Sequence, residues 1–248
     1  MKSADLHLRA DTKLAAAEAL KQLRERGAAK ANIRSSEVAR RIRDEPADGA
    51  QFPIEAGLLD PRRAIEELDR VIPKDYDSVS GAGHQAYFHS TMRGRKPENY
   101  HAIREFGAIG NGISLAIGVA AAKKNGKTVL FEGDGSLLMH IQELEMVQRH
   151  RLKLLICVLN DGAYGSEVHK LRADGIDDSG SIFGRTDLAS IAKGFGLRGT
   201  TVTGVSQLKP LFDAFQAQGT AELWNIHVSD RVVSPSTRRT VGRGHGKM

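Results

Sequence analysis

A second cysteine, a membrane-length apolar run and a signal-like apolar segment do not occur in this sequence. Cys157 is the only cysteine among 248 residues, so no intrachain disulfide can form, and it lies in an apolar run at residues 154–159. A buried thiol of this kind is typical of a reducing compartment. No run approaches the roughly 18 to 20 apolar residues that a membrane-spanning helix needs, and the first residues have no apolar signal core. We therefore expect a cytoplasmic protein with no membrane partner.

A block of charge of one sign is also lacking over most of the chain. Lysine and arginine total 36 against 30 aspartate and glutamate, a formal net charge of +6, but the basic residues are scattered over expected helices and loops. The densest basic run lies in residues 231–248, a segment that we expect to be a flexible tail. A solvated surface explains this pattern better than a nucleic-acid site does, so we expect no nucleic-acid partner.

From about residue 75 onward, short apolar strands alternate with glycine turns and helices. We expect strands at residues 76–79, 128–131, 154–159, 200–202 and 222–227, and helices at residues 113–124, 137–150, 188–195 and 206–218. Continuous apolar strands that alternate with helices predict an α/β fold, a doubly wound and mostly parallel sheet with helices on both faces. Ligands of such sheets bind at the carboxyl ends of the strands, which is where the glycine-rich loops lie.

Before residue 75 the pattern is weaker. A helix is expected after a cap at Asp11 or Thr12 and is stopped by Gly27, and another begins at Asp60-Pro61, where proline suits the first helical turn. The polar residues 28–60 between them are interrupted by prolines and a glycine, which indicates a linker or a long loop.

Two glycines and an aspartate follow the expected strand at residues 128–131. In Gly133-Asp134-Gly135-Ser136 the glycines let backbone N–H groups approach a phosphate closely at the start of a helix. Asp134 would repel a phosphate unless a hard divalent cation such as Mg²⁺ lies between them. The alternative is a tight turn in which Asp134 caps the helix, and these four residues alone do not decide between the two.

A second polar turn follows the next expected strand, with the sequence Asn160-Asp161-Gly162-Ala163-Tyr164-Gly165. A helix between two adjacent parallel strands places both turns at the same edge of the sheet. One oxygen side chain from each turn and one backbone carbonyl would supply about half of an octahedral Mg²⁺ shell. Taken alone, this second turn would be explained by its turn-forming residues.

Taken together, these segments resemble the diphosphate-binding domain of thiamine diphosphate enzymes, nearest to the acetolactate synthase, pyruvate decarboxylase and benzoylformate decarboxylase group. The resemblance covers about residues 55–230 and rests on the GDGS motif, the 27 positions from Asp134 to Asp161 and the strand–helix–strand around them. Residues 106–110, with the sequence FGAIG, resemble the segment that lies under the aminopyrimidine ring of the cofactor. The family implies thiamine diphosphate and Mg²⁺ as cofactors.

The resemblance implies a metal site formed by Asp134, Asp161 and the backbone carbonyl of Ala163. Asp161 stands where the family more usually has an asparagine, a change that keeps a hard oxygen donor and adds one negative charge. Asn160 lies one position too early and is a weaker candidate for the same ligand.

Two loops are implied to contact the diphosphate of the cofactor. Ser136 matches a diphosphate contact in the family, and Gly133, Asp134 and Gly135 belong to the same turn. Gly83-His84-Gln85 resembles the second of these loops, with a surface histidine as the alternative interpretation of His84.

The remaining implied residues lie towards the reactive end of the cofactor. The backbone of Gly107, next to Ala108, would accept a hydrogen bond from the amino group of the cofactor. Ile109 would wedge the cofactor into its bent, reactive shape and is assigned with Glu167 to catalysis, although ordinary core packing would also explain Ile109. Glu167 is level with a substrate-side glutamate of the family, with a solvated helix residue as the alternative. Tyr164 is expected in the same pocket, or else as an ordinary packed aromatic.

The family's full-length enzymes also contain a pyrimidine-binding domain and a central domain. Residues 1–54 resemble the end of a central domain followed by a linker, so we expect the carboxyl-terminal part of a longer enzyme. One subunit of a split enzyme is the alternative. The glutamate that activates the cofactor belongs to the pyrimidine-binding domain, so we expect a partner domain, a homo- or hetero-oligomer, and little turnover by this chain alone.

The expected function is that of the cofactor-binding part of an acetolactate synthase-like decarboxylase or carboligase acting on 2-oxo acids. The alternative is a complementing subunit or cofactor-binding module that is inactive alone. A nucleotide-binding domain is disfavoured, because no GxGxxG follows the first strand and no phosphate-binding GxxxxGK motif occurs. The sequence does not distinguish decarboxylation from carboligation and does not identify the substrate.

Overall fold

The computed structural model describes residues 5–29 and 33–244, with side chains placed up to residue 241. The chain divides into two compact units, Met1–Gly49 and Ala50–Met248. No helix within the described ranges is both long and apolar enough to cross a membrane.

The first unit contains helices α1 (Thr12–Glu25) and α2 (Ser36–Asp44). Asp11, one of the two predicted caps, accepts the backbone N–H of Leu14 and caps α1. Helix α2 lies inside the stretch expected to be a linker or loop, and for these residues that expectation is wrong. The side chain of Ser35 caps α2 by accepting a backbone N–H, and Glu37 pairs with Arg40 one turn later at 2.8 Å. These local polar contacts stabilise a short helix whose main apolar residues, Val38 and Ile42, lie four positions apart.

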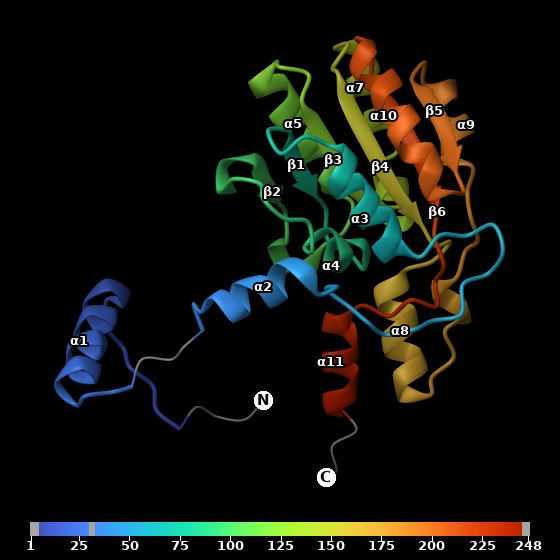
Figure 1. The fold of residues 1–248 in the computed structure, drawn as a ribbon. Helices are drawn as coiled ribbons and strands as arrows, with labels where there is room; N and C mark the ends of the chain where they lie inside the picture. Colours follow the sequence, from blue (N-terminus) through green and yellow to red (C-terminus); the bar gives the residue numbers. More distant parts are fainter. Residues whose placement is uncertain (1–4, 30–32, 245–248) are drawn as a thin grey trace. The chain divides into compact units, whose positions relative to one another are not determined.

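Six parallel strands form one sheet in the second unit, in the order β2-β1-β3-β4-β6-β5 (Figure 1). The strands are β1 (Asp77–Ser80), β2 (Tyr100–Ala102), β3 (Thr128–Gly133), β4 (Leu154–Asn160), β5 (Arg198–Val202) and β6 (Glu222–His227). Five of them lie where the sequence predicts a strand, and β2 is a short edge strand that the pattern does not reveal. All of β4 is buried, as a strand covered on both faces must be.

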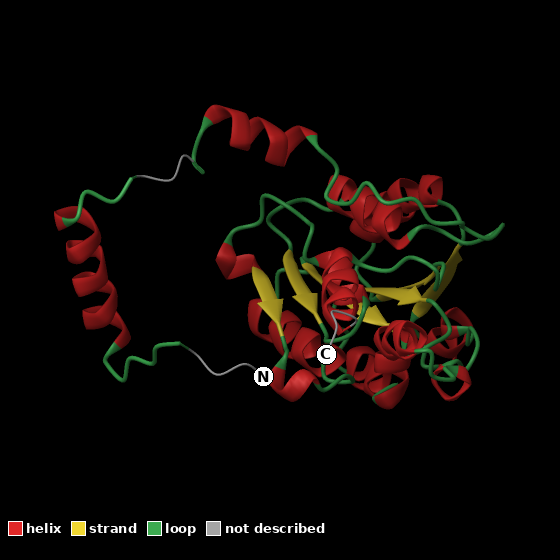
Figure 2. Cartoon of the chain, turned by 90° about the horizontal axis from the view of Figure 1, so that it is seen from below, coloured by secondary structure: helices red, strands yellow, loops and turns green. Residues whose placement is uncertain are grey.

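Helices cover both faces of this sheet, as Figure 2 shows from below. The helices of this unit are α3 (Pro61–Val71), α4 (Gln85–His89), α5 (Gly112–Lys123), α6 (Asp134–Met139), α7 (Glu143–Arg149), α8 (Gly165–Asp174), α9 (Leu188–Gly194), α10 (Leu208–Ala217) and α11 (Pro235–Gly244), of which α8 and α11 pack on each other. Helices α3, α4 and α10 share a core with Phe131, Cys157 and Trp224, whereas α5, α6, α7 and α9 pack over Leu130 and Ile156. Alternate strand residues thus supply two separate cores. The predicted doubly wound α/β fold is confirmed.

The helix predicted over residues 137–150 is in fact two helices, because α6 and α7 are separated at residues 140–142. His140 leaves the helical conformation, with φ −132° and ψ 37°, and its ring hydrogen-bonds to the carbonyl oxygen of Gly110. The break therefore comes from a tertiary contact that the periodicity of the sequence does not contain.

The segment 231–248 also differs from the flexible tail that its composition suggests, because residues 235–244 form helix α11. The buried hydroxyl of Ser234 accepts the backbone N–H of Thr237 at 3.2 Å, and α11 packs beside α8 (Figure 1). Capping and packing on a partner helix order a segment whose composition is polar and basic. Residues 245–248 lie outside the described residues, and the assignment of residues 1–54 to a central domain stays a prediction.

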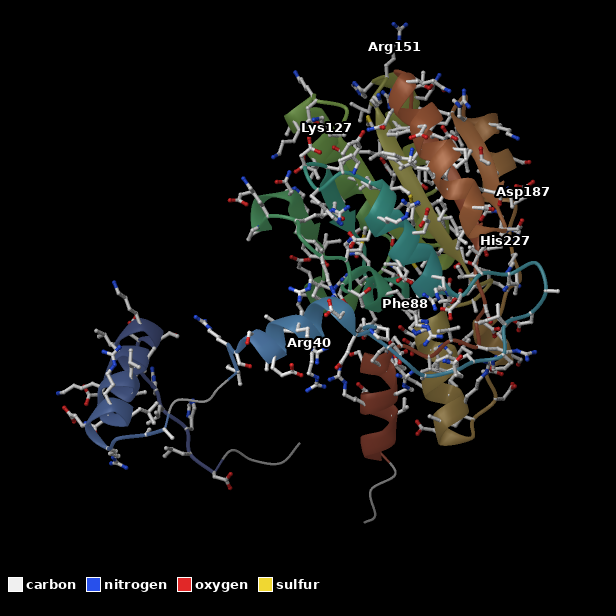
Figure 3. All side chains as sticks on the ribbon, viewed as in Figure 1. Arg40, Phe88, Lys127, Arg151, Asp187 and His227 are labelled. Carbon is white, nitrogen blue, oxygen red and sulfur yellow. The ribbon has the colours of Figure 1, made fainter. Side chains whose placement is uncertain are left out.

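The connections that follow the neighbouring parallel strands β1 and β3 lead to opposite faces of the sheet. Helix α4, which follows β1, packs on the α3 face, whereas α6 and α7, which follow β3, pack on the opposite face. Loops that leave two neighbouring strands towards opposite faces open a crevice at the carboxyl ends of those strands. Figure 3 shows Lys127 and Arg151 at the amino end of the sheet and Phe88 at the end where this crevice lies.

Candidate functional site

A cavity of about 390 Å³ opens at the carboxyl ends of β1, β3 and β4. Four segments line it: residues 82–85 after β1, residues 107–109, residues 133–136 after β3, and the turn from Asp161 into α8. The structure thus brings together all four segments that the sequence singles out, although up to 84 positions separate them, from residue 83 to residue 167.

Asp134 occupies the first position of α6 with 1% of its surface exposed. Its Oδ2 accepts the backbone N–H of Gly162 at 2.8 Å, which joins the turn after β3 to the turn after β4. In that second turn, Oδ1 of Asp161 accepts the N–H of Ala163 at 3.2 Å. Both carboxyl groups are therefore oriented by backbone N–H groups at the floor of the cavity.

The electrostatics of these two carboxyl groups favour a cation. Burial raises the pKa of Asp134, and burial together with the charge of Asp134 raises the pKa of Asp161 well above its usual range. Two carboxylates in a poorly solvated place repel each other, and a positive ion between them would remove both penalties.

A third oxygen completes the possible donor set. The carbonyl of Ala163 accepts no hydrogen bond from the described residues, whereas the carbonyl of Gly162 accepts those of Phe183 and Gly184 at 3.0 and 2.9 Å. Two carboxylates and one carbonyl fit a hard divalent cation such as Mg²⁺. Within the described ranges, no cluster of three or more His, Cys, Asp or Glu side chains could hold a metal, so the backbone oxygen is needed.

Asn160 is not brought into the cavity. Its fully buried amide donates to Oδ1 of Asn225 at 2.8 Å and to the carbonyl of Thr186 at 3.0 Å. Successive residues at a strand end point to opposite sides, so Asn160 and Asp161 cannot both face Asp134. Of the two candidates for the second side-chain ligand, only Asp161 lies at the site.

Ser136 lines the cavity, but its side chain also has a neighbour within the protein. Its Oγ accepts the backbone N–H of Gly110 at 2.8 Å. In the same turn Gly135 is overlaid by aromatic rings, because a Cβ there would lie 2.7 Å from Cε1 of Tyr164 and 3.2 Å from Cζ of Phe183. Tyr164 and Phe183 meet edge to face with centroids 5.1 Å apart.

Glu132 is a functional candidate that the sequence interpretation misses. It is fully buried beneath the cavity, its Oε1 accepts Nε2 of Gln85 at 3.3 Å, and its Oε2 has no hydrogen-bond partner among the described residues. Burial raises its pKa to about 7. A side chain on Gly81 or Gly112 would collide with this carboxyl group. Period-two alternation in β3 puts residue 132 on the same side as Leu130, which is the signal that could have revealed it.

His84 lines the cavity close to Asp161. Nε2 of the buried His84 accepts the backbone N–H of Ser234 at 3.2 Å, so the ring hydrogen lies on Nδ1. Burial, with a smaller effect from His169, lowers the pKa of His84 to about 3. Gly165 leaves room beside it, since a Cβ there would lie 3.2 Å from Nδ1. A neutral ring with this tautomer can donate one hydrogen bond to an anionic ligand.

The remaining predicted residues lie at the mouth of the cavity. Gly107, with φ +72°, Ala108 and Ile109 line one side, and Phe106 beside them is fully exposed. Glu167 lines the other side and forms an exposed ion pair with Lys170 at 2.8 Å. The position of Glu167 fits the predicted catalytic role and also fits the alternative, a solvated helix residue.

A family model described as "Thiamine pyrophosphate enzyme, C-terminal TPP binding domain" matches residues 81–223. The acetolactate synthase isozyme 2 large subunit of Escherichia coli is 27% identical over 172 residues, 68% of this chain and 30% of its own. Acetolactate synthase 2 of Zea mays, described as chloroplastic, is 29% identical over 163 residues, 60% of this chain and 25% of its own.

Two solved structures share the fold. The thiamine diphosphate-dependent 4-hydroxybenzoylformate decarboxylase of Rhodococcus jostii superposes with a TM-score of 0.65 at 21% identity, over 74% of this chain and 35% of that one. Benzoylformate decarboxylase of Polynucleobacter necessarius gives a TM-score of 0.65 at 17% identity, over 71% of this chain and 34% of that one. The chain spans between about a quarter and a third of the length of all four proteins.

Proposed function

The chain belongs to the thiamine pyrophosphate enzymes, whose C-terminal TPP-binding domain it contains, and on that premise we propose that it holds thiamine diphosphate through Mg²⁺. We further propose that it serves an acetolactate synthase-like 2-oxo acid decarboxylase or carboligase. The observation that carries the metal proposal is the buried Asp134 and the partly buried Asp161 beside the carbonyl of Ala163, which accepts no hydrogen bond from the described residues.

Each part of the cavity has a role in this proposal. Asp134, Asp161 and the carbonyl of Ala163 hold the ion, and the ion neutralises the diphosphate, which the carboxylates alone would repel. Backbone N–H groups of residues 133–136 and Nδ1–H of His84 donate to the diphosphate, with Gln85 and Gly83 at its side.

The reactive end of the cofactor belongs to residues 107–109 in this proposal. The backbone of Gly107 orients the aminopyrimidine ring, and Ile109 supports the bent shape. Thiamine diphosphate supplies an electron sink for cleaving the bond next to the carbonyl group of a 2-oxo acid. Glu167 and Tyr164 lie at the mouth, where a substrate would approach.

We propose that turnover needs a pyrimidine-binding domain and an oligomeric assembly. Apolar side chains stand exposed around the cavity mouth, namely Phe106, Met139, Tyr164, Ile182 and Phe183. Exposed apolar clusters beside a site are typical of surfaces that another polypeptide covers.

A cytoplasmic location also stays a proposal, supported by the single buried Cys157.

Calorimetry tests the binding proposal directly. Thiamine diphosphate with Mg²⁺ should bind, whereas ATP and NAD with Mg²⁺ should not, and Asp134→Ala should abolish the metal-dependent binding. Equal affinity of Asp134→Ala and the unaltered chain would refute the site.

Adding a chain that contains a pyrimidine-binding domain and following carbon dioxide release from pyruvate or benzoylformate would test the proposed activity.

A further inference from the structure

Helix α6 holds both polar backbone atoms of Gly110. Oγ of Ser136 accepts the N–H of Gly110 at 2.8 Å, and Nδ1 of His140 lies 2.8 Å from the carbonyl oxygen of Gly110. A carbonyl can only accept, so the hydrogen of this contact is on Nδ1 of His140. Ser136 lies in α6 and His140 directly follows its last residue, and both side chains reach Gly110.

Gly110 is shaped for this contact. Its φ of +99° favours glycine, and a Cβ at this position would lie 2.9 Å from Nδ1 of His140 and 3.2 Å from Cβ of Met139. The backbone of Gly110 can approach α6 only because it has no side chain.

This contact fixes the exposed segment that precedes it. Residues 107–109 lie at the cavity mouth after a turn in which Phe106 and Gly107 have positive φ. Within the described residues, no side chain other than those of Ser136 and His140 hydrogen-bonds to the backbone of residues 107–110. The position of this segment therefore depends on how firmly Gly110 is held.

The same short helix begins at the proposed metal site. Asp134 is the first residue of α6, and His140 directly follows its last residue. Six helical residues form a spacer of about 9 Å. One element thus sets the separation between the oxygens that face a metal and the backbone that faces an aromatic ring.

We propose that His140 is a positioning residue that, with Ser136, holds residues 107–109 at a fixed distance from the Asp134–Asp161 site. The contact selects ligands in which a diphosphate and a ring are joined at that spacing, and it leaves the affinity for the diphosphate alone unaffected. This inference rests on the proposed function, because it assigns the ring end of the cofactor to residues 107–109.

The test compares two ligands on the same folded chain by calorimetry in excess Mg²⁺: thiamine diphosphate and inorganic diphosphate. His140→Ala should weaken thiamine diphosphate binding by about three- to tenfold, the range for one lost hydrogen bond, and leave inorganic diphosphate binding within about twofold. His140→Asn keeps a donor for the carbonyl of Gly110 and should restore part of the affinity. His150→Ala, at an exposed histidine after α7, is the matched control and should change neither.

Equal losses for both ligands would show a merely structural role and overturn the proposal, as would no loss for either. Failure of the unaltered chain to bind either ligand would overturn the proposed function and this inference with it.

A second measurement needs no alanine variant. In a chain labelled with ¹⁵N-histidine, the His140 ring, assigned by its absence in His140→Asn, should carry its hydrogen on Nδ1. Its signals should shift with thiamine diphosphate and not with inorganic diphosphate. Identical responses to both ligands would contradict the proposal even if His140→Ala failed to fold.

Discussion

Gly162 donates its backbone N–H to Oδ2 of Asp134 at 2.8 Å, so the turns after β3 and β4 are bonded to each other directly. The bond orients one carboxyl group of the proposed metal site through the backbone of the turn that supplies the other. The two turns are thus held together by the protein itself, and the charge of Asp134 raises the pKa of Asp161.

Replacing Asp161 with asparagine should therefore stabilise the metal-free chain. The change removes one of two neighbouring carboxylates and keeps an oxygen that can accept the N–H of Ala163. We expect the free energy of unfolding at pH 8 without Mg²⁺ to rise by on the order of 1 kcal/mol, and the gain on adding Mg²⁺ to shrink. Urea denaturation with and without MgCl₂ measures both. An unchanged metal-free stability would show that the two charges do not oppose each other.

Asn160 and Asp161 should behave differently although they are adjacent. Asn160→Ala leaves Oδ1 of Asn225 and the carbonyl of Thr186 without a donor from residue 160, which should cost about 1 to 3 kcal/mol of stability. The rise in melting temperature with Mg²⁺ should persist in Asn160→Ala and disappear in Asp161→Ala. A reversed result would make Asn160 the ligand.

Two glycines of α5 offer a matched test of the space around Glu132. Gly112→Ala would push a Cβ into the carboxyl group of Glu132 and should lower stability by about 1 to 3 kcal/mol. Gly118→Ala, in the same helix with no atom within 4 Å of the added Cβ, should raise stability by about 0.5 to 1 kcal/mol. The measurement is the melting temperature of the two variants and of the unaltered chain. Similar changes in melting temperature in both variants would argue against a buried carboxyl group next to Gly112.

The pH dependence of stability should contain a contribution from Glu132. Burial raises its pKa from 4.5 to about 7 in the folded chain. Below pH 4.5 both states are protonated, and between pH 4.5 and about 7 the unfolded chain loses a proton that the folded chain keeps. Unfolding therefore becomes more favourable as the pH rises through this window.

Glu132→Gln removes this contribution. The difference in unfolding free energy between pH 5 and pH 8 should become smaller in the variant by on the order of 1 to 3 kcal/mol. Urea denaturation of both proteins at the two pH values gives the change in unfolding free energy with pH for each protein. An effect of the new amide that is the same at both pH values does not alter that change. The same pH dependence in both proteins would place the titration elsewhere.

The sequence predicts the architecture because the strands of this sheet are buried on both faces. Runs such as residues 154–159 are apolar throughout, and the glycine turns that follow them mark the strand ends where ligands bind. The same reasoning identifies Asp134 and Asp161 as neighbours, since adjacent parallel strands bring their turns to one edge. The positions of the strands and of the turns that follow them can therefore be predicted from short stretches of sequence and their order along the chain.

Contacts between distant segments are what the sequence does not carry. Helix α6 ends where His140 bonds to the carbonyl of Gly110, thirty positions earlier. The hydrophobic periodicity of the sequence does not predict that bond. Helix α11 is ordered by the cap at Ser234 and by its packing on α8, neither of which is visible in its basic composition. Asn160 and Asp161 both resemble ligands in the sequence, where the spacing of the family motif favours Asp161, and the structure separates them because the side chain of Asn160 bonds to Asn225 and Thr186 while Asp161 lines the cavity.

The pairing of β4 with β6 places the only cysteine beside the only tryptophan, because Cys157 and Trp224 are partners in register and are buried in the same core. A thiol quenches indole fluorescence on contact, so the native chain should emit weakly and at short wavelength. Separation of the two strands would then brighten the emission and shift it to the red. The protein thus contains an optical reporter of sheet integrity whose two residues lie outside the lining of the cavity.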